Sequence, residues 1–101
     1  MLGNNLPDTI EIEVTQEVLN ESCQRIQSGR RISTNCPTAV ALNKLGYTNP
    51  SVGLSDIILS GDVSQYRASA ELEAEIENFN WTYHRTFRLG KYIITKIKES
   101  K

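Results

Sequence analysis

A short apolar segment between Pro37 and Gly46 most constrains the fold of this chain. Proline suits the first turn of a helix, where its missing N–H is no loss, and glycine commonly follows a helix end. Either Asn35 or Cys36 is then the N-cap, and Asn35 is the better capping residue. The apolar residues of the segment are Ala39, Val40, Ala41, Leu42 and Leu45. They occupy most of the helix circumference, so we expect a short, buried helix.

The residues before this segment predict one strand and one longer helix. Residues 9–14 alternate apolar and polar side chains, which is typical of a strand with one buried and one solvated face. Thr15 is a good N-cap for a helix over 16–27, and Ser28 with Gly29 ends it. The apolar side of this helix contains Leu19, Cys23 and Ile26.

The middle of the chain shows a turn and weaker strand patterns. Asn49-Pro50 predicts a bend, because the residue before a proline avoids the helical region. Residues 52–59 have strand composition, and Gly53 within them marks a bulge or a close backbone approach. Residues 63–67 are predicted to return as an edge strand.

The last third predicts a helix followed by a strand. Ser69 is a suitable N-cap, and Gly90 is a natural residue for the C-terminal end of a long helix. The apolar stripe of that helix is Leu72, Ile76, Phe79, Tyr83 and Phe87. An alternative ends the helix at 78–80 and forms a hairpin from 81–87 and 92–97. We prefer the long helix because the stripe continues without changing phase. The strand over 92–97 is common to both interpretations.

Together these elements predict a single α+β domain over residues 1–101. It has a small mixed or antiparallel sheet with two to three helices packed on one face, in the order β-α-α-β-(β)-α-β. Residues 1–84 carry five Lys and Arg against eleven Asp and Glu, whereas residues 85–101 carry six against one. Pairing of Glu11 and Glu13 with Lys96 and Lys98 across neighbouring strands would explain this asymmetry without a ligand.

Composition argues against several classes of protein. The net charge of −1 makes nucleic acid an unlikely partner. No apolar run is long enough to cross a membrane, and the first residues lack the pattern of a signal peptide, so we expect a cytoplasmic location. Cys23, Cys36 and the single histidine, His84, have no metal-binding spacing. We therefore expect free thiols, no metal and no cofactor.

The start of the helix at Pro37 is the strongest candidate for a binding site. A helix N-terminus presents unpaired N–H groups that attract anions, and two arginines stand just upstream. The predicted ligand-binding residues are Arg30, Arg31, Thr34, Asn35 and Thr38. The competing interpretation is that both arginines point into water and Asn35 alone satisfies the helix start.

Catalysis is not predicted. A helix N-terminus near arginines lowers a thiol pKa, but a nucleophilic Cys36 also needs a base, and nothing in the spacing brings His84 to it. We interpret Cys36 as a structural thiol and the chain as no enzyme. Trp81 lies off the apolar stripe and is predicted to be partly exposed or to form an interface. With the uneven charge, it leads us to expect a homo-oligomer, most simply a homodimer.

Three motifs resemble those of small proteins encoded by bacteriophages. They are Ile-Glu-Val-Thr-Gln-Glu at 12–17, Cys-Pro-Thr-Ala-Val-Ala-Leu at 36–42 and Ser-Val-Gly at 51–53, followed by a helix, Gly90 and a strand. Proteins of that group typically have a strand ending Val-Thr-x-Glu, a Cys-Pro-x-x-x-Ala-Leu helix and a Val-x-Val-Gly strand. The resemblance implies an accessory role in infection and assigns no catalytic residue.

Two functions therefore stand as hypotheses. In the first, the chain binds a small anionic, nucleotide-like ligand and counters a host defence signal. In the second, it is a protein–protein interaction module, or an inhibitor of a host protein, that uses a surface centred on Trp81.

Overall fold

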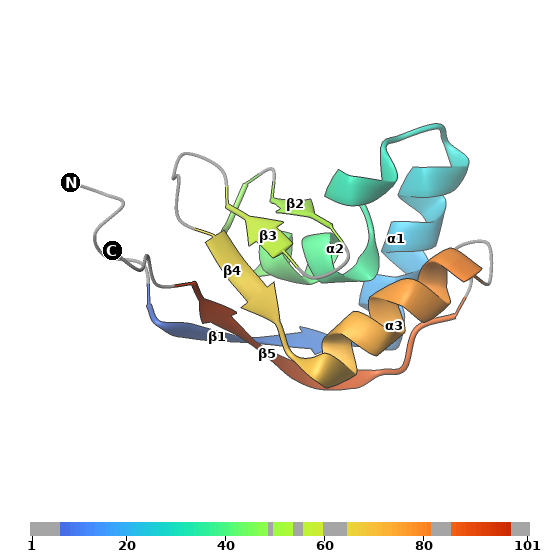
Figure 1. Ribbon diagram of the computed structural model, residues 1–101. Helices are drawn as coiled ribbons and strands as arrows, with labels where there is room; N and C mark the ends of the chain where they lie inside the picture. The colour runs from blue at the N-terminus through green and yellow to red at the C-terminus, as the bar shows by residue number, and fades with distance from the viewer. Residues whose placement is uncertain (1–6, 49, 54–55, 60–64, 82–85, 98–101) are drawn as a thin grey trace.

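An antiparallel sheet curls around a layer of helices in this protein (Figure 1). The computed structural model describes residues 7–48, 50–53, 56–59, 65–81 and 86–97. Within these residues the elements are β1 (Thr9–Val14), α1 (Gln16–Gln27), the 3-10 helix η2 (Ile32–Thr34), α2 (Pro37–Lys44), β2 (Ser51–Val52), β3 (Asp56–Ile58), β4 (Gln65–Ala68), α3 (Ala70–Trp81) and β5 (Gly90–Lys96). The strand order is β1-β5-β4-β3-β2, and each neighbouring pair is antiparallel.

One face of the sheet is buried under the helices, and the other is exposed. In β1 every second side chain is buried, and β5 alternates in the same way. The buried face packs against α1, α2 and α3 to form one core. The largest fully buried apolar side chains are Tyr66, Phe79, Ile12, Leu42, Ile57, Leu59, Leu72 and Ile94. The predicted α+β class, with helices on one face of a small sheet, is confirmed.

The helices α1 and α2 begin and end as their local sequence predicts. The Val18 N–H donates to the Thr15 hydroxyl at 3.2 Å, which caps α1. Gly46 follows α2 with φ of +106°, a backbone conformation that glycine adopts without strain. Cys36 rather than Asn35 is the N-cap of α2, because Asn35 ends η2 and its side chain bonds within that turn.

The segment predicted as one strand over 52–59 is a hairpin of two short strands. Ser51 pairs with Ile58, and Val52 pairs with Ile57. The Gly53 N–H donates to the Asp56 carbonyl at 2.8 Å, so of the two predicted roles Gly53 has the close backbone approach and not the bulge. Both arms have the same strand composition, so no change of pattern marks the turn.

The strand β4 lies inside the sheet, whereas an edge strand was predicted over 63–67. It pairs with β3 on one side and with β5 on the other. Residues 63–64 lie outside the described residues. The edge prediction is wrong because β5 inserts between β1 and β4, and such long-range order leaves no mark on the local sequence.

The helix α3 starts as predicted but ends at Trp81, well before Gly90. Its N-cap is confirmed, since the Leu72 N–H donates to the Ser69 hydroxyl at 3.2 Å. Residues 86–89 have no regular structure, so the long helix is wrong. The alternative hairpin over 81–87 is also wrong, because Trp81 is helical and residues 86–87 form no strand. Tyr83 of the predicted stripe lies outside the described residues.

The first and last strands, β1 and β5, are neighbours, as the charge pattern suggested. Their register places a different lysine opposite the glutamates of β1 from the two that were predicted. Glu13 lies opposite Lys91, and Glu11 lies opposite Ile93. Lys96 lies opposite Tyr66 of β4, and Lys98 lies outside the described residues. Among the described residues of β1 and β5, the two opposite charges that face each other across the strands are therefore Glu13 and Lys91.

Candidate functional site

A cavity of about 360 Å³ opens between η2, the β2–β3 hairpin and α3. Its lining residues are Ile32, Ser33, Cys36, Val52, Gly53, Ile76, Phe79, Asn80 and Phe87. Apolar side chains dominate the lining, and the polar side chains are a hydroxyl, an amide and a thiol. Pockets for small ligands have this character, with volumes of about 300–1,000 Å³ and a few polar groups.

One wall of this cavity is the segment that follows α3, which polar contacts hold against the helix. The Arg88 N–H donates to the Glu75 carboxylate at 2.9 Å, and the Asn78 amide donates to the Thr86 hydroxyl at 3.1 Å. The Tyr92 hydroxyl donates to the Arg88 carbonyl at 2.6 Å. These contacts return the chain toward the core, so the aromatic ring between Thr86 and Arg88 reaches the cavity.

That ring, Phe87, belongs to an aromatic cluster. It meets Phe79 edge to face with centroids 6.1 Å apart and Tyr92 with centroids 5.8 Å apart. Edge-to-face contacts of this kind add stability beyond the burial of area. Phe87 continues the apolar stripe of α3 in sequence but joins the core from a loop. This is why apolar spacing predicted too long a helix.

The opposite wall, η2, is tied to α1 and α2 by polar contacts that local sequence patterns do not reveal. The Ser22 hydroxyl donates to the Asn35 carbonyl at 2.7 Å. One Arg25 nitrogen donates to the Asn43 amide oxygen at 3.0 Å and to the Asn35 amide oxygen at 3.4 Å. The Asn35 amide donates in turn to the Arg31 carbonyl at 2.8 Å. Asn35 therefore holds η2 in place.

The same arginine is itself positioned by a carboxylate. Arg25 donates to Glu21 one helical turn earlier, and the Lys44 ammonium lies 3.2 Å from the same carboxylate. The hydrogen bonds from Arg25 and Lys44 hold the pKa of Glu21 below its usual range. Both contacts stabilise the charged form of Glu21, so this corner is more stable when Glu21 is ionised.

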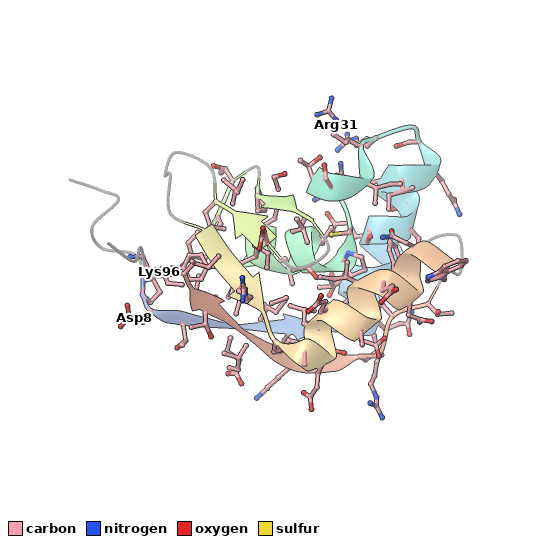
Figure 2. All side chains as sticks on the ribbon, viewed as in Figure 1. Asp8, Arg31 and Lys96 are labelled. Carbon is pink, nitrogen blue, oxygen red and sulfur yellow. The ribbon has the colours of Figure 1, made fainter. Side chains whose placement is uncertain are left out.

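The structure divides the predicted anion site into an exposed part and a buried part. Arg30 and Arg31 are exposed, and Figure 2 shows Arg31 extending away from the body of the protein. Thr34 is half-buried and donates to the Arg31 carbonyl at 3.4 Å. Asn35 and Thr38 are buried, and the Thr38 hydroxyl has no hydrogen-bond partner among the described residues. Anion binding by these residues remains a prediction.

The first turn of α2 is covered by the chain itself. Cys36, Pro37 and Thr38 are all buried, and Cys36 also contributes to the lining of the cavity. Burial raises the pKa of the Cys36 thiol to about 11, although the backbone N–H groups of Ala39 and Thr38 oppose this rise. The Cys36 thiol is therefore protonated at neutral pH, a state that is a poor nucleophile. His84 lies outside the described residues.

Trp81 ends α3 and is 76% exposed, which agrees with its position off the apolar stripe. An indole ring with this exposure is a common anchor at protein interfaces. Trp81 is absent from the residues that line the cavity, so the two features are separate candidates for function.

Several residues that line the cavity were not among the predicted ligand-binding residues. They include Ile32, Ser33, Val52 and Asn80. They come from three elements far apart in sequence, and none belongs to a motif. One sequence signal could have pointed to the cavity. The apolar spacing of α3 continues to Phe87, beyond the end of the helix at Trp81, and Phe87 lines the cavity.

In the part of the chain that the structure describes, no group of three or more His, Cys, Asp and Glu side chains is arranged to hold a metal ion. The described helices include none with the length and apolar character needed to cross a membrane. Comparison with protein-family models, with curated proteins and with solved structures finds no match.

Proposed function

We propose that this chain is a non-enzymatic binding protein for a small anionic ligand with an aromatic body, of the size of a nucleotide. The cavity between η2, the β2–β3 hairpin and α3 is the single observation that carries the proposal. An aromatic ring of the ligand would lie among Ile32, Val52 and Phe79, where apolar contacts favour it. The Ser33 hydroxyl and the Asn80 amide would then meet polar atoms at the ring edge.

Arg30 and Arg31 would supply the contact with the anionic group. They immediately precede Ile32 and Ser33, two residues that line the cavity. Since the first turn of α2 is covered, the anion would lie at the rim of the cavity and not on the helix N-terminus. A guanidinium at such a rim would bind phosphate through paired N–H groups.

The resemblance to small bacteriophage proteins supports an accessory role during infection. A protein that sequesters a nucleotide needs a pocket and no catalytic machinery, and the protonated Cys36 thiol fits this requirement. Removal of a nucleotide signal from solution would counter a host defence that depends on it. This role and the cytoplasm of the host bacterium as its location form part of the proposal.

Calorimetric titration with a panel of cyclic and linear nucleotides tests the proposal. We expect one class of nucleotide to bind with one site per chain, and Ile32→Asp to weaken it by placing a charge at the cavity. Leu45→Asp is the matched control, because it changes another exposed apolar residue that lies outside the cavity lining. No heat with any nucleotide at about millimolar concentration, the limit of weak binding, would refute the proposal.

Exposure of Trp81 favours a second function, in which the chain binds a host protein through this surface. The test is capture from a bacterial lysate by the wild-type chain and by Trp81→Ser, with Leu45→Ser as the control. A partner retained by the wild type and the control but lost with Trp81→Ser would support this function. Equal capture by all three chains would remove Trp81 from consideration.

A further inference from the structure

The η2 wall of the cavity is held in place from outside the cavity. None of the three residues of η2 is buried, so no fully buried side chain anchors this turn. Ile32 and Ser33, which line the cavity, belong to η2, and Arg31 immediately precedes it. Contacts that fix η2 against the body of the protein therefore also fix one wall of the proposed ligand site.

Asn35, at the C-terminal end of η2, is the residue through which this turn is attached. Its amide donates to the Arg31 carbonyl at 2.8 Å and to the Thr34 hydroxyl at 3.1 Å, and its backbone N–H donates to the Ile32 carbonyl at 3.1 Å. These bonds close the turn on itself. They leave the two oxygens of Asn35, the backbone carbonyl and Oδ1, to accept from another element.

Both oxygens accept hydrogen bonds from α1. The Ser22 hydroxyl donates to the Asn35 carbonyl at 2.7 Å, and Arg25 Nη1 donates to Asn35 Oδ1 at 3.4 Å. Ser22 and Arg25 are three positions apart, so they share one side of α1. Among the described residues, these two bonds are the side-chain hydrogen bonds that join residues 31–35 to another helix or strand.

The two donors on α1 have fixed positions themselves. The side chain of Ser22 is 0% exposed. Arg25 donates to the Glu21 carboxylate on its own helix, and its Nη1 also donates to the Asn43 amide oxygen of α2 at 3.0 Å. Donors that are locked by packing and by further hydrogen bonds hold their acceptor in one place.

From these contacts we propose that Ser22 and Arg25 are positioning residues that act through Asn35 to fix η2, and with it the cavity wall. The expected effect on ligand binding rests on the proposed function, whereas the effect on η2 does not. Asn35 was predicted to bind the ligand, but it is absent from the cavity lining. It acts from behind the wall and not by contact with the ligand.

The chain offers a matched control for the Ser22 hydroxyl. Ser28 caps the C-terminal end of the same helix, and its hydroxyl also donates to a backbone carbonyl, that of Arg25, at 2.8 Å. This bond does not involve η2. Ser22→Ala and Ser28→Ala therefore remove the same group and the same kind of bond, and Ser22→Ala is the change that releases η2.

Amide hydrogen exchange of the ligand-free chain, followed by NMR, tests the proposal. The N–H groups of Asn35 and Cys36 both donate to the Ile32 carbonyl, so their exchange reports the opening of η2. Ser22→Ala and Arg25→Met should each speed exchange at these two amides about tenfold, as expected when a buried acceptor loses its donor. Ser28→Ala should leave both rates unchanged.

Ile94→Val separates positioning from a general loss of stability. It trims a fully buried side chain of β5 and destabilises the whole fold without touching η2. Because η2 opens locally, exchange at Asn35 and Cys36 should not respond to this change. Unchanged exchange in Ser22→Ala, or equal acceleration by Ser22→Ala and Ile94→Val, would overturn the proposal.

The nucleotide titration carries the test to the cavity. Ser22→Ala should weaken binding about fivefold, while Ser28→Ala and Ile94→Val should leave the affinity unchanged. Full affinity in Ser22→Ala despite faster exchange at η2 would overturn the role in the cavity. If the wild type binds no nucleotide, the proposed function fails, and the exchange rates alone decide whether Ser22 and Arg25 position η2.

Discussion

Leu42 on α2 provides the sharpest test of the core, because its side chain is 0% exposed. The change Leu42→Ala removes three carbon atoms from a helix that packs against α1 and β1. At about 0.8 kcal/mol for each buried carbon, the lost transfer free energy is about 2.4 kcal/mol. The cavity left behind adds to this, and measured Leu→Ala changes in cores span about 2–5 kcal/mol. We expect a loss of free energy of unfolding within this range.

Leu45→Ala is the matched control, because Leu45 adjoins the same helix but is 52% exposed. Its loss should stay below about 0.5 kcal/mol, as for surface changes in general. Urea denaturation followed by circular dichroism measures both values with one denaturant slope. A loss below about 0.5 kcal/mol for Leu42→Ala would contradict the burial of α2, as would equal losses for the two variants.

Three further predictions concern the backbone, pH and thiol reactivity. Gly90→Val should lower the free energy of unfolding by about 1–3 kcal/mol, because Gly90 has φ of +149° and β-branched residues are strained there. Thermal unfolding measures this loss, and an unchanged melting temperature would contradict the prediction. The pKa of Glu21 is lowered in the folded state, so its stabilising effect is complete above its unfolded pKa and is lost as pH falls through the folded one. Glu21→Gln should therefore flatten the loss of stability between neutral and acid pH, and an identical pH profile would contradict the contact with Arg25. Cys36, whose pKa is raised to about 11, should react with iodoacetamide at pH 8 only after urea unfolding, whereas rapid reaction of the native chain at Cys36 would contradict its burial.

Local signals explain why the first half of the fold was predictable. The alternation over 9–14, the cap at Thr15 and the glycine at Gly46 each act within a few residues, and each has the expected role in the structure. The helix at Pro37 is buried for the reason the sequence suggested, since apolar residues occupy most of its circumference. Such features depend on backbone preference and apolar periodicity, which are present in the sequence itself.

Long-range contacts explain the errors. The Arg88 N–H donates to Glu75, 13 residues earlier on α3, and apolar periodicity in the sequence does not predict such a bond. The role of Asn35 depends on Arg25, ten residues earlier on another helix. The cavity likewise combines η2, β2 and α3, which only the folded chain brings together. The sequence predicted a binding site around Arg31, and the structure shows which groups are accessible there: Arg30 and Arg31 are exposed, whereas Asn35 and Thr38 are buried.

Amide chemical shifts in a nucleotide titration followed by NMR test the central claim most directly, because they report binding and its location together. The account predicts that the largest shifts occur at residues lining the cavity, such as Ser33, Gly53 and Asn80. It also predicts that Arg30→Glu with Arg31→Glu weakens binding more than a hundredfold, since each lost charge-assisted contact is worth about 1.5–3 kcal/mol. Absence of shifts at about millimolar nucleotide, or shifts confined to the exposed face of the sheet around Ile93, would contradict the account.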